Sequence, residues 1–218
     1  MRMRRLSGVL SLTTAAALAA CGATPAASPT ATPTPSRTIP AVTLSPDAVG
    51  FVSTVLIERK RNLGASAAAY VRIAPPSASD SDAIQAKLSD GSSIAASYRA
   101  ATLRTDGSNK GLYESSDLPP LAAGIYVEGL REIAIQPAGR SAAHKHAGFE
   151  IVLVLDGTLL VRTQLAAPAI VEKGQGFTYS VSNSPIQLFN IGGTVARTLV
   201  YSITADGLPF STNLDQSP

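Results

Sequence analysis

Apolar and polar residues alternate over short runs along much of this 218-residue chain, a pattern typical of β-strands. Successive side chains of a strand point to opposite faces, so a period of two indicates one buried face. From residue 124 onward such runs recur about every ten residues, separated by turn-forming residues. The strands expected in this half are 125–127, 132–135, 149–155, 158–163, 170–171, 176–181, 186–189 and 196–203. Evenly spaced strands predict an all-β sandwich or barrel.

Three features of this half predict how the strands connect. Apart from Glu150, residues 149–155 are apolar on both faces, which suits a strand that is buried on both faces. Asp156-Gly157 is a two-residue hairpin signal, so we expect 158–163 to return antiparallel to 149–155. Pro137-Ala138-Gly139 predicts a turn.

The preceding segment shows weaker patterns. The apolar runs 51–57 and 69–73 predict a hairpin that turns within 59–64. Residues 94–103 predict a further strand, and 112–120 a loop that Pro119-Pro120 keeps irregular. Residues 82–88 are compatible with a short helix capped by Ser81 or Asp80.

The N-terminus has the organisation of an export signal. Arg2, Arg4 and Arg5 precede an apolar stretch that is too short to span a bilayer. Leu18-Ala-Ala-Cys21 then resembles the lipobox of bacterial lipoproteins, which implies cleavage after residue 20 and a lipid on Cys21. The alternative is plain secretory cleavage near Ala20. Arg4-Arg5 leaves the choice between general secretion and twin-arginine export open.

The resemblance to a lipoprotein implies a domain order and a location. Residues 1–20 would be the signal peptide, and 21–46, rich in Pro, Thr and Ala, a disordered tether behind the lipidated cysteine. Residues 47–210 would form one domain and 211–218 a C-terminal tail. The protein would be held by its lipid on the cell membrane or outer membrane, outside the cytoplasm. Cys21 is the only cysteine, so no intramolecular disulfide is expected.

Charge and composition exclude a nucleic-acid partner. Removal of residues 1–20 takes away three of the 18 basic residues and none of the 15 acidic ones, which leaves 15 of each. A neutral mature chain does not call for a polyanionic partner. Aromatic residues make up 5% of the chain and Trp is absent, so base stacking is not expected either.

The candidate chemistry lies in one short segment. The only two histidines, His144 and His146, are two residues apart, and Glu150 follows four residues later. Residues i and i+2 of a strand share a face, so both imidazoles project together. Two imidazoles and a carboxylate are a common ligand set for a divalent transition metal. The alternative is a pair of surface histidines near a turn.

The same segment resembles the first motif of the cupin family, G-x5-H-x-H-x3,4-E-x6-G. Residues 139–157 match it with Gly139, His144, His146, Glu150 and Gly157, the first gap being one residue short. Residues 174–192 are similar to the second motif, and the likeness covers 121–204. It implies a double-stranded β-helix, the cupin jelly-roll barrel, here with an extra N-terminal hairpin. It also implies that His144, His146 and Glu150 point into a pocket in the barrel mouth.

The second motif departs from the family where a further histidine ligand is expected. Aligning Asn190 with the Asn of the motif puts Ile186 at the histidine position. The other alignment, with Asn183, puts Tyr179 there. Either way one protein ligand is missing. The remaining set suits Fe, Mn, Zn or Ni without distinguishing among them.

Three functions fit these observations. The first is a binding module that holds a divalent metal or a small ligand in the barrel mouth, which the sequence favours over catalysis. The second is a metal-dependent dioxygenase, isomerase or lyase, with Tyr126, Glu132 and Gln187 as candidates for supporting or proton-transfer roles. The third is a metal-free interaction module with a vestigial site. The family likeness also implies pairing into a homodimer.

Overall fold

The structure is a computed structural model that describes residues 47–65, 68–77, 80–100, 103–104, 111–164, 166–179 and 184–214. The expected signal peptide, the tether with Cys21, Asn183 and residues 215–218 lie outside this part of the chain. The regular elements described are fourteen β-strands, β1 to β14. No helix in the described ranges is long and apolar enough to cross a membrane.

The strands form two sheets. Ten belong to the larger sheet: β1 (Val49–Leu63), β6 (Gly124–Arg140), β7 (His144–His146), β8 (Phe149–Asp156), β9 (Thr158–Thr163), β10 (Ala169–Glu172), β11 (Gly176–Tyr179), β12 (Ile186–Asn190), β13 (Ala196–Ala205) and β14 (Ser211–Asn213). Four belong to the smaller sheet: β2 (Ala69–Ala74), β3 (Ile84–Lys87), β4 (Ser93–Ala100) and β5 (Tyr113–Glu114).

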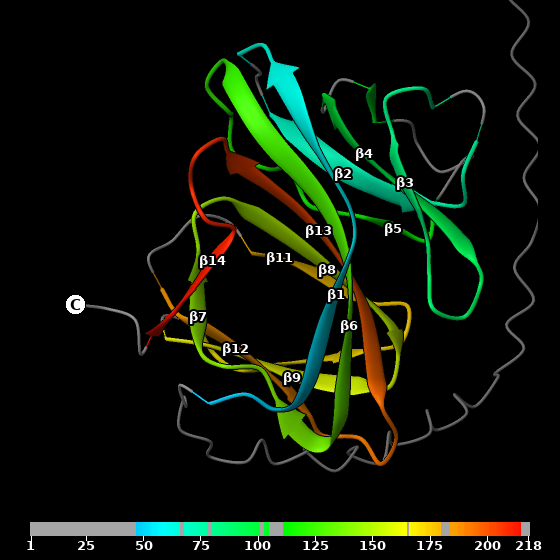
Figure 1. The fold of residues 1–218 in the computed structure, drawn as a ribbon, viewed down its shortest axis with the longest axis vertical. Helices are drawn as coiled ribbons and strands as arrows, with labels where there is room; N and C mark the ends of the chain where they lie inside the picture. Colours follow the sequence, from blue (N-terminus) through cyan, green and yellow to red (C-terminus); the bar gives the residue numbers. More distant parts are fainter. Residues whose placement is uncertain are drawn as a thin grey trace, which may run out of the picture. The chain divides into compact units, whose positions relative to one another are not determined.

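The larger sheet curls into a nearly closed barrel with two walls (Figure 1). One wall has the order β1-β6-β13-β8-β11, and the other has the order β10-β9-β12-β7-β14. All the strand pairs in both walls are antiparallel. This is a double-stranded β-helix, so the predicted fold class is confirmed. Curling the sheet in this way leaves few exposed edges.

A bulge in β6 links the two walls. Phe51 pairs with Ile135 and Val49 with Arg140, so two steps along β1 match five along β6. Ala138, inside this interval, has φ 59°, a left-handed conformation that non-glycine residues rarely adopt. Beyond the bulge Arg140 pairs with Phe189 of β12 in the other wall. The turn predicted at 137–139 is therefore a bulge, and the two short strands predicted before it, 125–127 and 132–135, are parts of one long strand.

Strand β8 is apolar on both faces because both faces are covered. Val152 and Val154 point into the barrel and join its interior core. Ile151 and Leu153 point outward and join a second core with residues of the smaller sheet, such as Ile73. The smaller sheet thus packs on the outside of the wall that contains β8. The prediction of a strand buried on both faces is confirmed.

Two predictions before residue 100 were wrong. β1 pairs with β6 and β2 pairs with β4 and β5, so the expected N-terminal hairpin of 51–57 with 69–73 does not form. Long-range pairing of β1 along β6 replaces the local turn. The expected helix at 82–88 contains strand β3 instead, which pairs with β4. Ile84 is buried there, so sheet packing overrides a weak helical pattern.

The expected hairpin at Asp156-Gly157 was also wrong. These residues join β8 to β9, but the two strands lie in opposite walls and do not pair. Both edges of β8 are occupied by β11 and β13, and both edges of β9 by β10 and β12. A tight turn here carries the chain across the barrel rather than back along the same sheet. At the other end, residues 211–213, expected in a tail, form β14 and pair with β7.

Candidate metal centre

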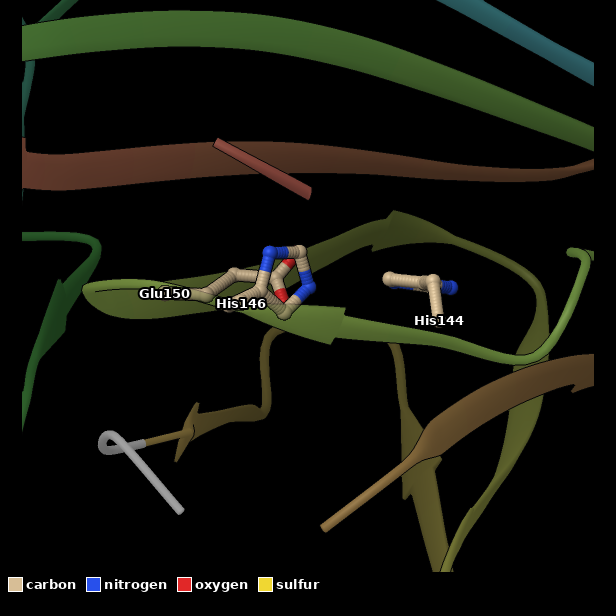
Figure 2. Close-up of side chains that lie close together, drawn as sticks. All are labelled: His144, His146 and Glu150. Carbon is tan, nitrogen blue, oxygen red and sulfur yellow. The ribbon is translucent and has the colours of Figure 1, made fainter. Parts of the chain in front are cut away.

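Two strands that are consecutive in the sequence but lie in opposite walls, β7 and β8, bring the three predicted residues together. His144 and His146 lie at the two ends of β7, and Glu150 is the second residue of β8. Figure 2 shows the Glu150 carboxylate against the His146 ring, with His144 next to it along the strand. The two imidazole centroids are 4.7 Å apart and the rings are nearly perpendicular. Their side chains share one face of β7, as the i, i+2 spacing predicts.

Small residues between β7 and β8 allow the chain to pass from His146 to Glu150 within four residues. A Cβ on Gly148 would lie 2.0 Å from the carbonyl oxygen of Ile203 in β13. Only glycine permits the chain to pass this close to the neighbouring backbone. The passage between β7 and β8 therefore presses against β13, and Glu150 comes back beside His146.

Backbone carbonyls orient both rings. Nδ1 of His144 lies 2.7 Å from the Ala142 carbonyl oxygen, and Nδ1 of His146 lies 3.1 Å from that of Phe210. A ring nitrogen that meets a carbonyl carries the proton and donates it. Nε2 is then the nitrogen with the free lone pair on each ring. This is the arrangement by which proteins fix metal-binding histidines.

The contact between His146 and Glu150 is short. Nε2 of His146 lies 2.9 Å from Oε2 of Glu150, and both side chains are almost fully buried. The approach does not have hydrogen-bond alignment, so Nε2 has no hydrogen-bond partner among the described residues. Burial disfavours the charged forms, but the opposite charges outweigh it, raising the pKa of His146 and lowering the pKa of Glu150. The carboxylate is therefore ionised at neutral pH.

His144 differs electrostatically from His146. Burial lowers the pKa of His144 below the usual histidine value, although the Glu150 charge acts in the opposite direction. A neutral imidazole can act as a metal ligand. One donor atom from each of the three residues lies within 4.8 Å of the others. The donor set, two imidazole nitrogens and one carboxylate oxygen, thus fits a divalent transition metal.

The three residues line a cavity of about 270 Å³ between the two walls. Its other walls are mainly apolar. They include side chains from β1, β6 and β12 and from the C-terminal segment: Phe51, Ile133, Leu188 and Phe210. Polar side chains complete the lining: Ser53, Arg131, Ser141, Ser211 and Asn213. Apolar walls with a few polar groups that converge on the space are typical of small-molecule pockets.

The two candidates for the missing ligand lie on opposite sides of the cluster. Ile186 is fully buried and pairs with His144 across β12 and β7, so the two side chains share a face. Tyr179 pairs with Glu150, and its ring centroid is 5.7 Å from that of His146. Its hydroxyl donates to the Ser184 carbonyl.

The three residues proposed for supporting roles lie away from the cavity lining. Tyr126 donates to the Ala122 carbonyl, and Gln187 donates to that of Ser141. Glu132 accepts from Ser89 and Arg197. Glu132 and Tyr126 occupy even positions of β6, on the opposite face from the cavity-lining Ile133.

Sequence reasoning missed two residues of the site. Arg131 lines the cavity from β6, and Phe210 lines it just before β14. The period of two identifies Arg131, because it shares a face with Ile133 and Ile135. Phe210 carries no comparable signal, because the short strand that follows it is polar.

Comparison with known proteins supplies no family assignment. No family model and no curated protein matches the chain. Solved structures with similar folds include a double-stranded β-helix cupin from Methanocaldococcus jannaschii, at 12% identity over 36% of this chain and 71% of that one (TM-score 0.34). A cupin-like protein from Thermotoga maritima aligns at 18% identity over 40% of this chain and 64% of that one (TM-score 0.36).

Enzymes also occur among the similar structures. An oxalate oxidase in complex with glycolate aligns at 23% identity over 40% of this chain and 46% of that one (TM-score 0.36). A DMSP lyase structure aligns at 21% identity over 39% of this chain and 43% of that one (TM-score 0.35). The chain thus spans less than half of these two enzymes. Our fold assignment rests on the strand order and pairings described above.

Proposed function

We propose that this protein binds a divalent transition metal with His144, His146 and Glu150 and presents it to a small molecule in the adjoining cavity. The observation that supports this most directly is the fixing of both rings. Each Nδ1 meets a backbone carbonyl, which leaves Nε2 of each ring free to bind a metal, and one donor atom of each of the three residues lies within 4.8 Å of the others. Iron, manganese, zinc and nickel all accept this donor set.

Within this proposal each group has a distinct task. The Ala142 and Phe210 carbonyls hold the tautomers, and Glu150 supplies the negative charge that offsets part of the metal charge. The apolar walls exclude water around the site, which strengthens electrostatic interactions there. A bound divalent metal would supply Lewis acidity toward an oxygen of the ligand.

Metal analysis of the purified full chain, prepared without chelator or His-tag, tests this function. We expect near-stoichiometric metal in the wild type and its loss in His144→Ala/His146→Ala. Lys145→Ala is the matched control, because Lys145 lies between the histidines but does not line the cavity. Unfolding curves would confirm that all three proteins fold. A metal-free wild type would support the metal-free interaction module instead, and equal metal in the double variant would show that the metal binds away from these histidines.

Catalysis is the second candidate function, and the cavity favours it. Three protein ligands leave coordination positions open, as catalytic sites do, and the cluster faces a space large enough for a small substrate. The test is turnover by metal-loaded protein over a panel of phenols, diketones and sugars. We expect any turnover to disappear in His146→Ala. If none of these compounds is turned over, binding remains the proposed function.

The proposal extends to location. Leu18-Ala-Ala-Cys21 after a basic and an apolar segment supports lipidation of Cys21 and a tether at 21–46 that holds the domain outside the cytoplasm. Metabolic labelling with an alkyne fatty acid in a bacterial host tests it. Wild type should be labelled and fractionate with membranes, and Cys21→Ser should lose both properties. Labelling that persists in Cys21→Ser would contradict lipid anchoring at this residue.

A further inference from the structure

Arg131 places a positive charge in the wall of the metal-site cavity. Its side chain is 18% exposed, and its NH2 donates to the carboxylate of Glu58. The guanidinium carbon lies 4.9 Å from the centroid of the Phe210 ring. That same ring lies 4.5 Å from the His146 ring, centroid to centroid. Phe210 thus contacts both the guanidinium and a residue of the metal cluster.

The guanidinium of Arg131 is only partly used. Nε is buried and has no hydrogen-bond partner among the residues that the structure describes. A buried donor without a partner costs about 1–3 kcal/mol, so proteins rarely leave one unless a ligand or water completes it. Glu58 and Phe210 hold the side chain of Arg131 in place, and its Nε–H remains available to donate a hydrogen bond. Arginine in this state is suited to a carboxylate, which accepts two parallel hydrogen bonds.

The charges of the site favour an anion once a metal is present. A divalent ion and Arg131 together carry three positive charges, and Glu150 and Glu58 carry two negative ones. A monoanion would neutralise the remaining charge in a cavity with a mainly apolar lining. Ser53, Ser141, Ser211 and Asn213 also line the cavity, but Phe51, Ile133 and Leu188 offer no side-chain hydrogen bonds, so this part of the wall is suited to an apolar part of the ligand.

From these observations we infer that the cavity binds a small monocarboxylate with a short apolar body, whose carboxylate is held by Arg131. The inference rests on the proposed metal function, because the cation at the cluster supplies the charge that the anion balances. It names the class of ligand for that site and makes Arg131 a binding residue.

Calorimetric titration of the full-length protein loaded with zinc tests the inference. The probes are butyrate, acetate and the neutral isostere butyramide. We expect butyrate to bind at least tenfold more tightly than butyramide, because only the carboxylate pairs with Arg131, and more tightly than acetate, because its chain contacts the apolar wall. Equal affinity for butyrate and butyramide in the wild type would overturn the inference without any mutation.

A variant pair assigns the effect to Arg131. Arg131→Gln should weaken butyrate binding at least tenfold while its zinc content stays at the wild-type level. Arg140→Gln is the matched control, because Arg140 lies on the same strand outside the cavity lining and should bind butyrate as the wild type does. Unchanged butyrate affinity in Arg131→Gln would overturn the role of this residue.

Zinc content separates this inference from the proposed function. If the wild type takes up zinc but does not distinguish butyrate from butyramide, the metal function stands and the carboxylate inference fails. If the wild type takes up no zinc and does not bind butyrate, both fail. If it takes up no zinc and yet binds butyrate through Arg131, the metal function and the charge argument both fail, and only the role of Arg131 as the carboxylate-binding residue stands.

Discussion

Ile186 lies where one alignment of the second motif expects a further histidine ligand. It pairs with His144 on the adjacent strand and is fully buried. Leu188, two residues along the same face of β12, lines the cavity. The isoleucine therefore contributes an apolar surface to the interior where an imidazole would reach toward the cluster. An apolar neighbour makes the site drier but adds no donor.

Replacement of this isoleucine tests the alignment of the second motif. We expect Ile186→His to tighten zinc binding by about tenfold or more, roughly 1.4 kcal/mol, because it adds an imidazole beside His144. Competition titration against a chromophoric chelator measures the affinity. Tyr179→His is the comparison on the other side of the cluster. If Tyr179→His tightened zinc binding and Ile186→His left the affinity unchanged, Tyr179 would be the residue at the ligand position.

The three residues of the candidate centre, His144, His146 and Glu150, could be predicted from the sequence, but the cavity around them could not. Local spacing brings His144 and His146 onto one face, and two small residues return the chain to Glu150. Arg131 belongs to a distant strand, and its facing depends on the register of β6. Phe210 reaches the site only because β14 pairs with β7. Such long-range pairings leave little trace in the local sequence.

At the scale of elements, the bulge in β6 determines how the two walls of the barrel are joined, because it allows one strand to pair in both walls. Ala138 adopts a left-handed conformation there, and Gly139 lies so close to other backbone that a Cβ would be 2.6 Å from the Val49 carbonyl oxygen. Propensity within β6 alone predicts two strands and a turn. The observed continuity comes from pairing with β1 and β13, which extends along both sides of the strand.

A matched pair of substitutions tests the bulge. Ala138→Gly should stabilise the protein by up to about 1 kcal/mol, because the relief of a left-handed alanine, about 1–2 kcal/mol, exceeds the entropic cost of glycine, about 0.4–1 kcal/mol. Gly139→Ala should destabilise it by about 1–3 kcal/mol through the backbone clash. Urea unfolding of both variants measures these changes. If Ala138→Gly destabilised the protein, the left-handed conformation of Ala138 would not be a source of strain.

Glu132 connects elements of the two sheets and does not line the cavity of the candidate metal centre. Its carboxylate accepts from the backbone and hydroxyl of Ser89, near the turn between β3 and β4, and from Arg197 of β13. Burial opposes ionisation, but these hydrogen bonds outweigh it and hold the pKa of Glu132 below its ordinary value of 4.5. The ionised form is therefore favoured in the folded state.

This lowered pKa predicts a pH dependence of stability. A carboxyl whose folded pKa lies below its unfolded pKa stabilises the fold fully above about pH 4.5, and the contribution is lost as pH falls through the folded value. At pH 7 we expect Glu132→Gln to be less stable than wild type by about 1–3 kcal/mol. The difference should shrink below pH 4. Urea unfolding between pH 3 and 7 measures it, and a constant difference would contradict the assignment.

A metal at the candidate centre would act on the whole barrel. His144 and His146 belong to the wall with β12 and β14, and Glu150 belongs to the wall with β11 and β13. One ion held by all three residues would tie the walls together where the chain passes between them. An unfolded chain does not hold these donors in place, so metal binds the folded state preferentially and stabilises it.

The resulting prediction concerns thermal stability. At a free zinc concentration about 100-fold above the dissociation constant, binding should stabilise the fold by about 2.7 kcal/mol and raise the melting temperature by roughly 5–10 °C for a domain of this size. Differential scanning fluorimetry with and without zinc measures the shift. His144→Ala/His146→Ala should show no shift, while Lys145→Ala should behave as wild type. An equal shift in the double variant would mean that zinc acts elsewhere on the molecule, and the two walls would not be tied through this centre.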